Sequence, residues 1–166
     1  MRRIFPTIIG HFERLESRDK WSFLWRAWLE ATALAFVVGN AVQGVFPAGP
    51  RSDLAGLGFF HLVALAAFTG PLFETLAFQC LPIEAASSLG GRRWVRLTVS
   101  IVPFALMHSF AGMPTVVAAG VVGGFYFAFT YERWKKESLL AGVAMTFLIH
   151  SSYNLAGVIG MLVFPT

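Results

Sequence analysis

Apolar residues in this chain form five long runs, each separated from the next by a short segment rich in glycine, proline or charge. A helix needs about 20 mostly apolar residues to cross the hydrocarbon core of a bilayer. The runs therefore predict an all-α fold, a polytopic transmembrane helical bundle of about five spans. The predicted spans lie near residues 25–46, 56–80, 95–112, 114–131 and 138–163.

The first residues follow a different pattern from the spans. Apolar and charged side chains alternate there, which is typical of a helix lying on the membrane surface. The apolar positions are Ile4, Ile8, Ile9, Phe12 and Leu15. A solvated tail fits the same pattern, so both interpretations stay open. We divide the chain into an N-terminal cytoplasmic or interfacial segment, 1–22, and a transmembrane domain, 23–166.

Basic residues predict the orientation of the spans. They fall in the N-terminal tail and in two later connections, 92–96 and 133–136, whereas the other connections carry at most Arg51. These are alternate connections, and positive charge marks the cytoplasmic side of a membrane protein. We therefore expect a multi-pass protein of the cell membrane, inner or plasma, with its N-terminus in the cytoplasm and its C-terminus outside.

Composition supports a membrane protein and argues against a nucleic-acid partner. Of the 166 residues, 56% are hydrophobic and only 13% are charged, about half the charged fraction of a soluble domain. The net charge of +4 comes from basic residues at the ends of apolar runs, where they fit topology signals and contacts with anionic lipid. A single cysteine, Cys80, excludes an intramolecular disulfide and a cysteine-based zinc site.

Three ionisable residues lie well inside the apolar runs: Glu74, His108 and His150. A buried ionisable group in a membrane is costly, so each one is a candidate for function. At a rise of about 1.5 Å per residue, they lie roughly 15, 18 and 20 Å from the cytoplasmic ends of their spans. Asn154 lies one turn after His150 on the same helix face. These four residues therefore predict one shared site.

The chemistry of this set fits hydrolysis. A carboxylate held away from water can act as a general base near neutral pH, which suits Glu74. A water between Glu74 and His108 would attack a carbonyl, and His150 with the Asn154 amide would donate hydrogen bonds to the oxyanion. The alternative is a polar network that only joins the helices.

Near the start of the first span, Arg26 and Glu30 have the spacing of an ion pair.

Three motifs, in order, resemble those of the CAAX protease and bacteriocin-processing family of intramembrane proteases, which includes type II CAAX prenyl endopeptidases. The first family motif is a proline followed by Glu-Glu-x-x-Phe-Arg, and the other two are Phe-x-x-x-His and His-x-x-x-Asn. The resemblance covers residues 60–160. The matching segments read Pro71-Leu-Phe-Glu74-Thr75-Leu-Ala-Phe78-Gln79, Phe104-Ala-Leu-Met-His108 and His150-Ser-Ser-Tyr-Asn154.

The resemblance implies that Glu74 activates the water, that His108 helps to hold it, and that His150 and Asn154 stabilise the oxyanion. This chain departs from the first motif at two positions. Thr75 stands at the second glutamate and Gln79 at the arginine, and we assign both a possible supporting role.

Zinc is the alternative to a metal-free site. Two histidines and a glutamate are a legitimate catalytic zinc set, and the ligands would then be Glu74, His108 and His150. Thr75 leaves no second carboxylate beside Glu74 to act as the base in that case. The residues therefore favour a site without metal.

The first functional hypothesis is an intramembrane endopeptidase whose substrate is a hydrophobic or membrane-anchored peptide. A second hypothesis is a catalytically inactive relative that acts as a membrane scaffold or immunity protein, and the altered first motif supports it. A third hypothesis, a small transporter with a proton relay, is disfavoured because five spans without an internal repeat do not fit the usual transporter plan.

Overall fold

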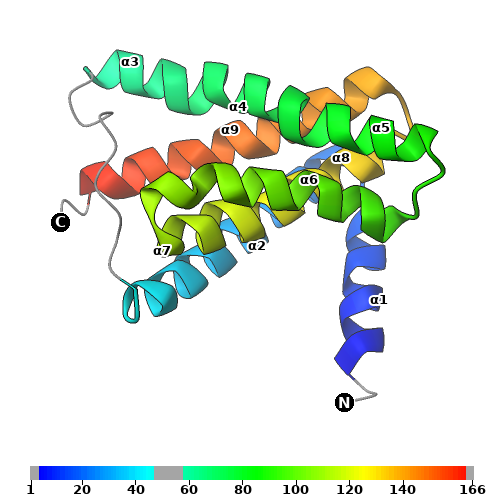
Figure 1. Cartoon of the computed structure of the whole chain (residues 1–166), viewed down its shortest axis with the longest axis horizontal. Coiled ribbons are helices and arrows are strands. Elements are labelled where there is room, and N and C mark those ends of the chain that lie inside the picture. The colour runs from blue at the N-terminus through cyan, green and yellow to red at the C-terminus, as the bar shows by residue number, and fades with distance from the viewer. Residues whose placement is uncertain (1–3, 47–57, 164–166) are drawn as a thin grey trace.

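The computed structural model describes residues 4–46 and 58–163, and every regular element in these two ranges is a helix (Figure 1). Two elements precede the gap: α1 (Ile4–Glu16) and α2 (Lys20–Gln43). The elements after it are α3 (Phe59–Ala64), η2 (Leu65–Thr69), α4 (Gly70–Glu74), η3 (Thr75–Cys80), α5 (Leu81–Ser88), α6 (Arg93–Met107), η4 (His108–Ala111), α7 (Met113–Thr115), η5 (Val116–Gly123), α8 (Gly124–Trp134) and α9 (Leu139–Val163). The all-α prediction is confirmed.

Within the described ranges, four helical stretches are long and apolar enough to cross a membrane: Phe59–Ser88, Arg93–Ala111, Met113–Trp134 and Leu139–Gly160. The first predicted span corresponds to α2, whose 24 residues are about 36 Å long at the usual helical rise. Polar residues lower the mean hydropathy of α2, so it is not among these four stretches. Figure 1 nevertheless shows α2 running between the same two ends of the bundle. It packs against η5 and α9.

The stretch Phe59–Ser88 is one nearly continuous helix with two π-helical segments, η2 and η3. Each segment comes just before a proline, Pro71 or Pro82. A proline has no N–H and its ring clashes with the carbonyl four residues earlier, so the preceding turn widens. The helix can then continue through Pro82 to Ser88. The helix therefore runs about two turns beyond residue 80, near which the sequence predicted the end of this span.

Ion pairs join the helices at the basic end of the bundle. The Arg96 guanidinium donates from Nε and Nη2 to the two carboxylate oxygens of Glu132, at 2.8 and 2.7 Å. Lys135 Nζ lies 3.1 Å from Glu132 and 3.1 Å from Glu84. Because Glu132 is only 1% exposed, its charge depends on these partners. The network fixes α5, α6 and α8 to one another.

One local prediction is wrong. Arg26 does not pair with Glu30. Glu30 instead contacts the His11 ring nitrogen Nε2 at 2.9 Å and accepts a hydrogen bond from the Tyr126 hydroxyl at 3.3 Å. Tertiary partners on α1 and α8 therefore replace the neighbour one turn away. The connection between the first two predicted spans, residues 47–55, lies outside the described residues.

Gly120 allows η5 and α6 to come into backbone contact. A Cβ atom at this position would lie 2.6 Å from the Cα of Ala105. Cβ atoms in folded proteins essentially never come this close to another atom, so any side chain at this position would push the two helices apart. The small-residue spacing of Gly120 and Gly124 thus permits the close approach that such spacings allow in membrane bundles.

We therefore expect Gly120→Ala to lower the free energy of unfolding by about 1–3 kcal/mol through overpacking. Gly157→Ala is the matched control, because a Cβ at Gly157 meets no atom within 4 Å. That control should be neutral or slightly stabilising, since alanine favours helix more than glycine does. Reversible unfolding of the purified protein in mixed micelles measures both variants. Equal stability of the two would contradict the packing argument.

Candidate active site

Glu74 and His150 come together in the middle of the bundle. Glu74 is the last residue of α4, and His150 lies near the centre of α9, which packs against α4 and η3. Nε2 of His150 is 3.3 Å from Oε2 of Glu74. The histidine side chain is 1% exposed, whereas the glutamate side chain is 34% exposed. Glu74 is therefore the member of the pair that a substrate or water can reach.

Aromatic side chains hold the His150 ring in place. The ring is stacked on Phe127 at 4.1 Å between centroids and lies edge-on to Phe104 at 5.6 Å. Its second nitrogen, Nδ1, is buried and has no hydrogen-bond partner. A proton on Nδ1 would be left without an acceptor, which is costly. The geometry thus favours the tautomer whose proton is on Nε2, facing Glu74.

His108 lies at the junction of α6 and η4. Its Nδ1 is 2.8 Å from the carbonyl oxygen of Phe104. A carbonyl only accepts, so Nδ1 carries the proton and Nε2 of the neutral ring is left as an acceptor. The His108 ring also contacts the Phe104 ring, at 4.6 Å between centroids. Phe104 therefore contacts both histidines, and His108 approaches the pair through this shared aromatic ring rather than through a direct bond.

Asn154 is placed by a defect in the long helix. The N–H of Gly70 bonds to the carbonyl of Leu65, five residues earlier, as in a π-helix. The next residue, Pro71, has no N–H. The carbonyl of Ala66 is thereby left without its usual helical donors, and Asn154 Nδ2 donates to it at 2.9 Å. One N–H of the asparagine is thus occupied, and a second N–H remains.

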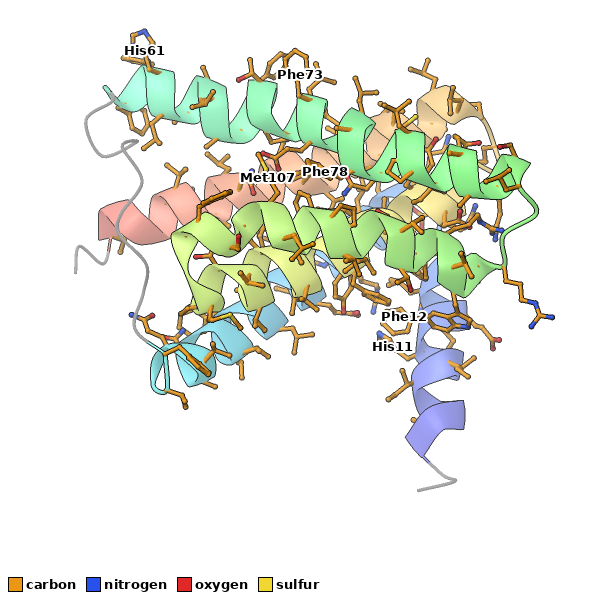
Figure 2. The ribbon with its side chains drawn as sticks, in the orientation of Figure 1. His11, Phe12, His61, Phe73, Phe78 and Met107 are labelled. Atoms are coloured by element: carbon orange, nitrogen blue, oxygen red, sulfur yellow. The ribbon has the colours of Figure 1, made fainter. Side chains whose placement is uncertain are left out.

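Thr75 and Gln79 face the interior of the bundle. Both are 0% exposed, and the hydroxyl of Thr75 and both amide atoms of Gln79 have no hydrogen-bond partner. They lie on η3, which packs against α6, α8 and α9. Figure 2 shows the two sides of this helix through Phe73, which points away from the bundle, and Phe78, which points into it. Neither Thr75 nor Gln79 forms a hydrogen bond with Glu74 or His150, so any support is indirect.

The described residues contain no group of three or more His, Cys, Asp or Glu side chains arranged to hold a metal ion. Glu74 and His150 are close, but His108 is not gathered with them as a third ligand. Two surface grooves are present, of about 460 and 250 Å³. Neither groove is lined by Glu74, His108, His150 or Asn154. Access to Glu74 therefore comes from its partly exposed side chain rather than from either groove.

Sequence reasoning missed two features of the site. Phe127 stacks on His150, and the run of aromatic residues 125–131 was the available signal. The carbonyl of Ala66 binds Asn154, and Pro71 five residues later was the signal for it. Both features depend on contacts between helices, which spacing along one helix does not reveal.

A protein-family model described as Type II CAAX prenyl endopeptidase Rce1-like matches residues 56–156. The match covers more than half of the chain and includes Glu74, His108, His150 and Asn154. It confirms the resemblance that the three motifs indicated. No curated protein and no solved structure gives a significant match.

The two departures from the first motif can be tested together. Thr75→Glu alone would place a carboxylate at a position that is 0% exposed. We expect a loss of about 3–5 kcal/mol of unfolding free energy, the usual cost of an unpaired buried charge. Thr75→Glu combined with Gln79→Arg should be less unstable than the sum of the single changes, because the two charges lie one helical turn apart.

The control for size is Thr75→Gln, which has nearly the shape of glutamate without its charge. A double-mutant cycle of unfolding free energies should give a coupling of about 1–3 kcal/mol for the Glu and Arg pair. The cycle with Thr75→Gln should give little coupling. Additive effects in both cycles would show that charge pairing does not govern these positions.

Proposed function

Because the chain belongs to the Rce1-like family of type II CAAX prenyl endopeptidases, we propose that it hydrolyses a peptide bond of a membrane-associated substrate with a water activated by Glu74. The observation that carries the proposal is the 3.3 Å contact between Glu74 and His150. It brings a partly exposed carboxylate and an N–H donor together inside an apolar bundle. A carboxylate in such a setting can take a proton from water near neutral pH.

In the proposed mechanism, Glu74 removes a proton from the water as the water oxygen bonds to the substrate carbonyl carbon. The Nε2 atom of His108 accepts a hydrogen bond from the second O–H of that water, which stays on the oxygen. Once Glu74 carries the proton its contact with His150 weakens, so the N–H of His150, together with the remaining N–H of Asn154, donates to the oxyanion. As the C–N bond breaks, Glu74 returns the proton to the leaving amine. The same carboxyl group therefore acts as a base in the first half of the reaction and as an acid in the second half.

The substrate that this surface fits is a hydrophobic or membrane-anchored peptide. The outer faces of the long helices carry exposed apolar side chains such as Phe60, Phe73 and Leu106, so they are in contact with lipid. A peptide anchored in the same bilayer reaches Glu74 without leaving the membrane. Nucleic acid is not a partner in this proposal.

We expect Glu74→Gln to lower the cleavage rate by about 100-fold or more, because the amide cannot accept the proton of water. The substitution keeps the shape of the side chain and a possible hydrogen bond with His150. Purified wild type and variant are incubated with a library of membrane-anchored peptides, and the products are identified by mass spectrometry. Glu13→Gln, an exposed carboxyl on α1, is the matched control and should cleave as wild type does.

The same assay separates the alternatives. Cleavage that a chelator abolishes and zinc restores would replace the metal-free mechanism with one in which Glu74, His108 and His150 hold the ion. Equal binding and no cleavage by either protein would favour the inactive scaffold or immunity protein, for which the changes at Thr75 and Gln79 are the support.

We place the basic end of the bundle on the cytoplasmic side of the cell membrane, inner or plasma. Figure 1 shows the turns after α5 and α8 at the end of the bundle near α1, with the C-terminal part of α9 at the other end. Arg92, Arg93 and Lys136 lie at the first of these ends, which positive charge marks as cytoplasmic.

If α2 crosses the membrane with the four apolar stretches, the C-terminus is outside. We expect a periplasmic or extracellular reporter fused after Thr166 to be active and the same reporter fused before Met1 to be silent. Activity of a cytoplasmic reporter after Thr166 would contradict this orientation and the five-span count.

A further inference from the structure

Helix α1 runs across the basic end of the bundle and projects beyond the other helices (Figure 1). The long helices run between the two membrane faces, so a helix lying across their ends lies along the membrane surface. Figure 2 shows His11 and Phe12 on the side of α1 that faces the bundle. The N-terminal half of α1 extends past this contact and over the region that lipid occupies.

The apolar side chains on one face of α1 indicate contact with the bilayer. Phe12 packs against Phe125 and Phe129, and Leu15 is 4% exposed in the core. Ile8 lies on the same helical face, one turn earlier, but is 48% exposed because the bundle no longer covers it. Gly10 lies on the opposite face. One face of α1 thus packs against the bundle at Phe12 and Leu15. The same face is still apolar at Ile8, where the bundle no longer covers it.

Polar contacts fix the direction of α1. Nε2 of His11 contacts Glu30 on α2 at 2.9 Å. Arg93 on α6 pairs with the carboxylate of Glu16, and Arg133 on α8 donates to the carbonyl oxygen of Glu16 at 2.7 Å. Three helices of the bundle therefore hold α1, and Ile8 cannot turn away from the membrane without breaking these contacts.

Charge identifies the kind of lipid surface. Four exposed basic side chains on α1 and in the connections at this end form no ion pair with another described residue: Arg14, Arg18, Arg92 and Lys136. Glu13 and Asp19 are the exposed carboxyls at this end that also lack an ion pair within the described ranges. The excess of positive charge is complementary to phosphate groups of anionic lipids. The groove of about 250 Å³ between α1 and α6 is lined by Ile8, Ile9 and Trp94 and suits an acyl chain.

We propose that α1 is an interfacial anchor that lies in the headgroup layer of an anionic leaflet, with Ile8 among the acyl chains and the four basic side chains on lipid phosphates. Amphipathic helices bind membranes through these two terms, buried apolar area and attraction to anionic lipid. The anchor is independent of catalysis. It fixes the depth of α6 and α8, whose first and last turns it contacts.

The depth of two positions on α1 tests the proposal. Ile8→Cys and Gly10→Cys are spin-labelled in the full chain, reconstituted in vesicles of phosphatidylcholine and phosphatidylglycerol. Cys80 is buried, so the parent chain is the labelling blank. A Cβ at Gly10 meets only the flexible end of Arg14, at 3.4 Å, so this control should fold. We expect the label at residue 8 to be accessible to oxygen and shielded from a water-soluble nickel reagent, and the label at residue 10 to show the reverse. Equal water access at both positions would overturn the proposal.

Lipid selectivity tests the charge component. A variant with Arg14, Arg18, Arg92 and Lys136 all replaced by Gln should retain several-fold less phosphatidylglycerol on purification from a mixed membrane than the parent chain. A second variant, with the exposed Lys20 of the Lys20 and Glu137 pair replaced by Gln, should retain the parent amount. Equal retention by the fourfold variant and the parent would refute binding of anionic lipid at this end.

Discussion

Lipid offers no hydrogen-bond partners, so the polar contacts inside this bundle are made within the protein. Glu74 meets His150, Asn154 meets the carbonyl of Ala66, and Glu132 meets Arg96. Each of these contacts joins two different helices, so the requirement for partners also determines how the helices pack. The candidate active site is the part of this network that is left partly open, at the exposed side of the Glu74 carboxylate.

Proline connects the backbone to this network. Pro71 removes a donor from the long helix, the turn before it widens, and the carbonyl of Ala66 becomes available to Asn154. That hydrogen bond draws α9 against the same helix, and one turn earlier on α9 His150 reaches Glu74. The proline of the first motif therefore has a physical role: it generates the acceptor that sets the register between the two helices carrying the site.

Helix positions and the meeting of Glu74 with His150 could be predicted from the sequence, because both follow from hydrophobic length and a constant rise per residue. Interhelical partners could not. Glu30 binds His11 and Tyr126 rather than Arg26, and the long helix continues through Pro82, since π-helical turns absorb the proline. His108 stands where α geometry changes to 3₁₀, and its Nδ1 bonds to the carbonyl of Phe104. These outcomes depend on packing, which a single chain pattern does not encode.

The two altered motif positions have one property in common that constrains their interpretation. Thr75 and Gln79 are both fully buried, so a charge at one position without an opposite charge at the other would be strongly unfavourable. Replacement of both charged residues by neutral ones keeps the interior uncharged at this level. Because these side chains face the bundle interior and Glu74 is open on its outer side, the exchange leaves the reactive carboxylate and its contact with His150 in place. The departures therefore change the surroundings of the proposed mechanism without removing any group that it uses.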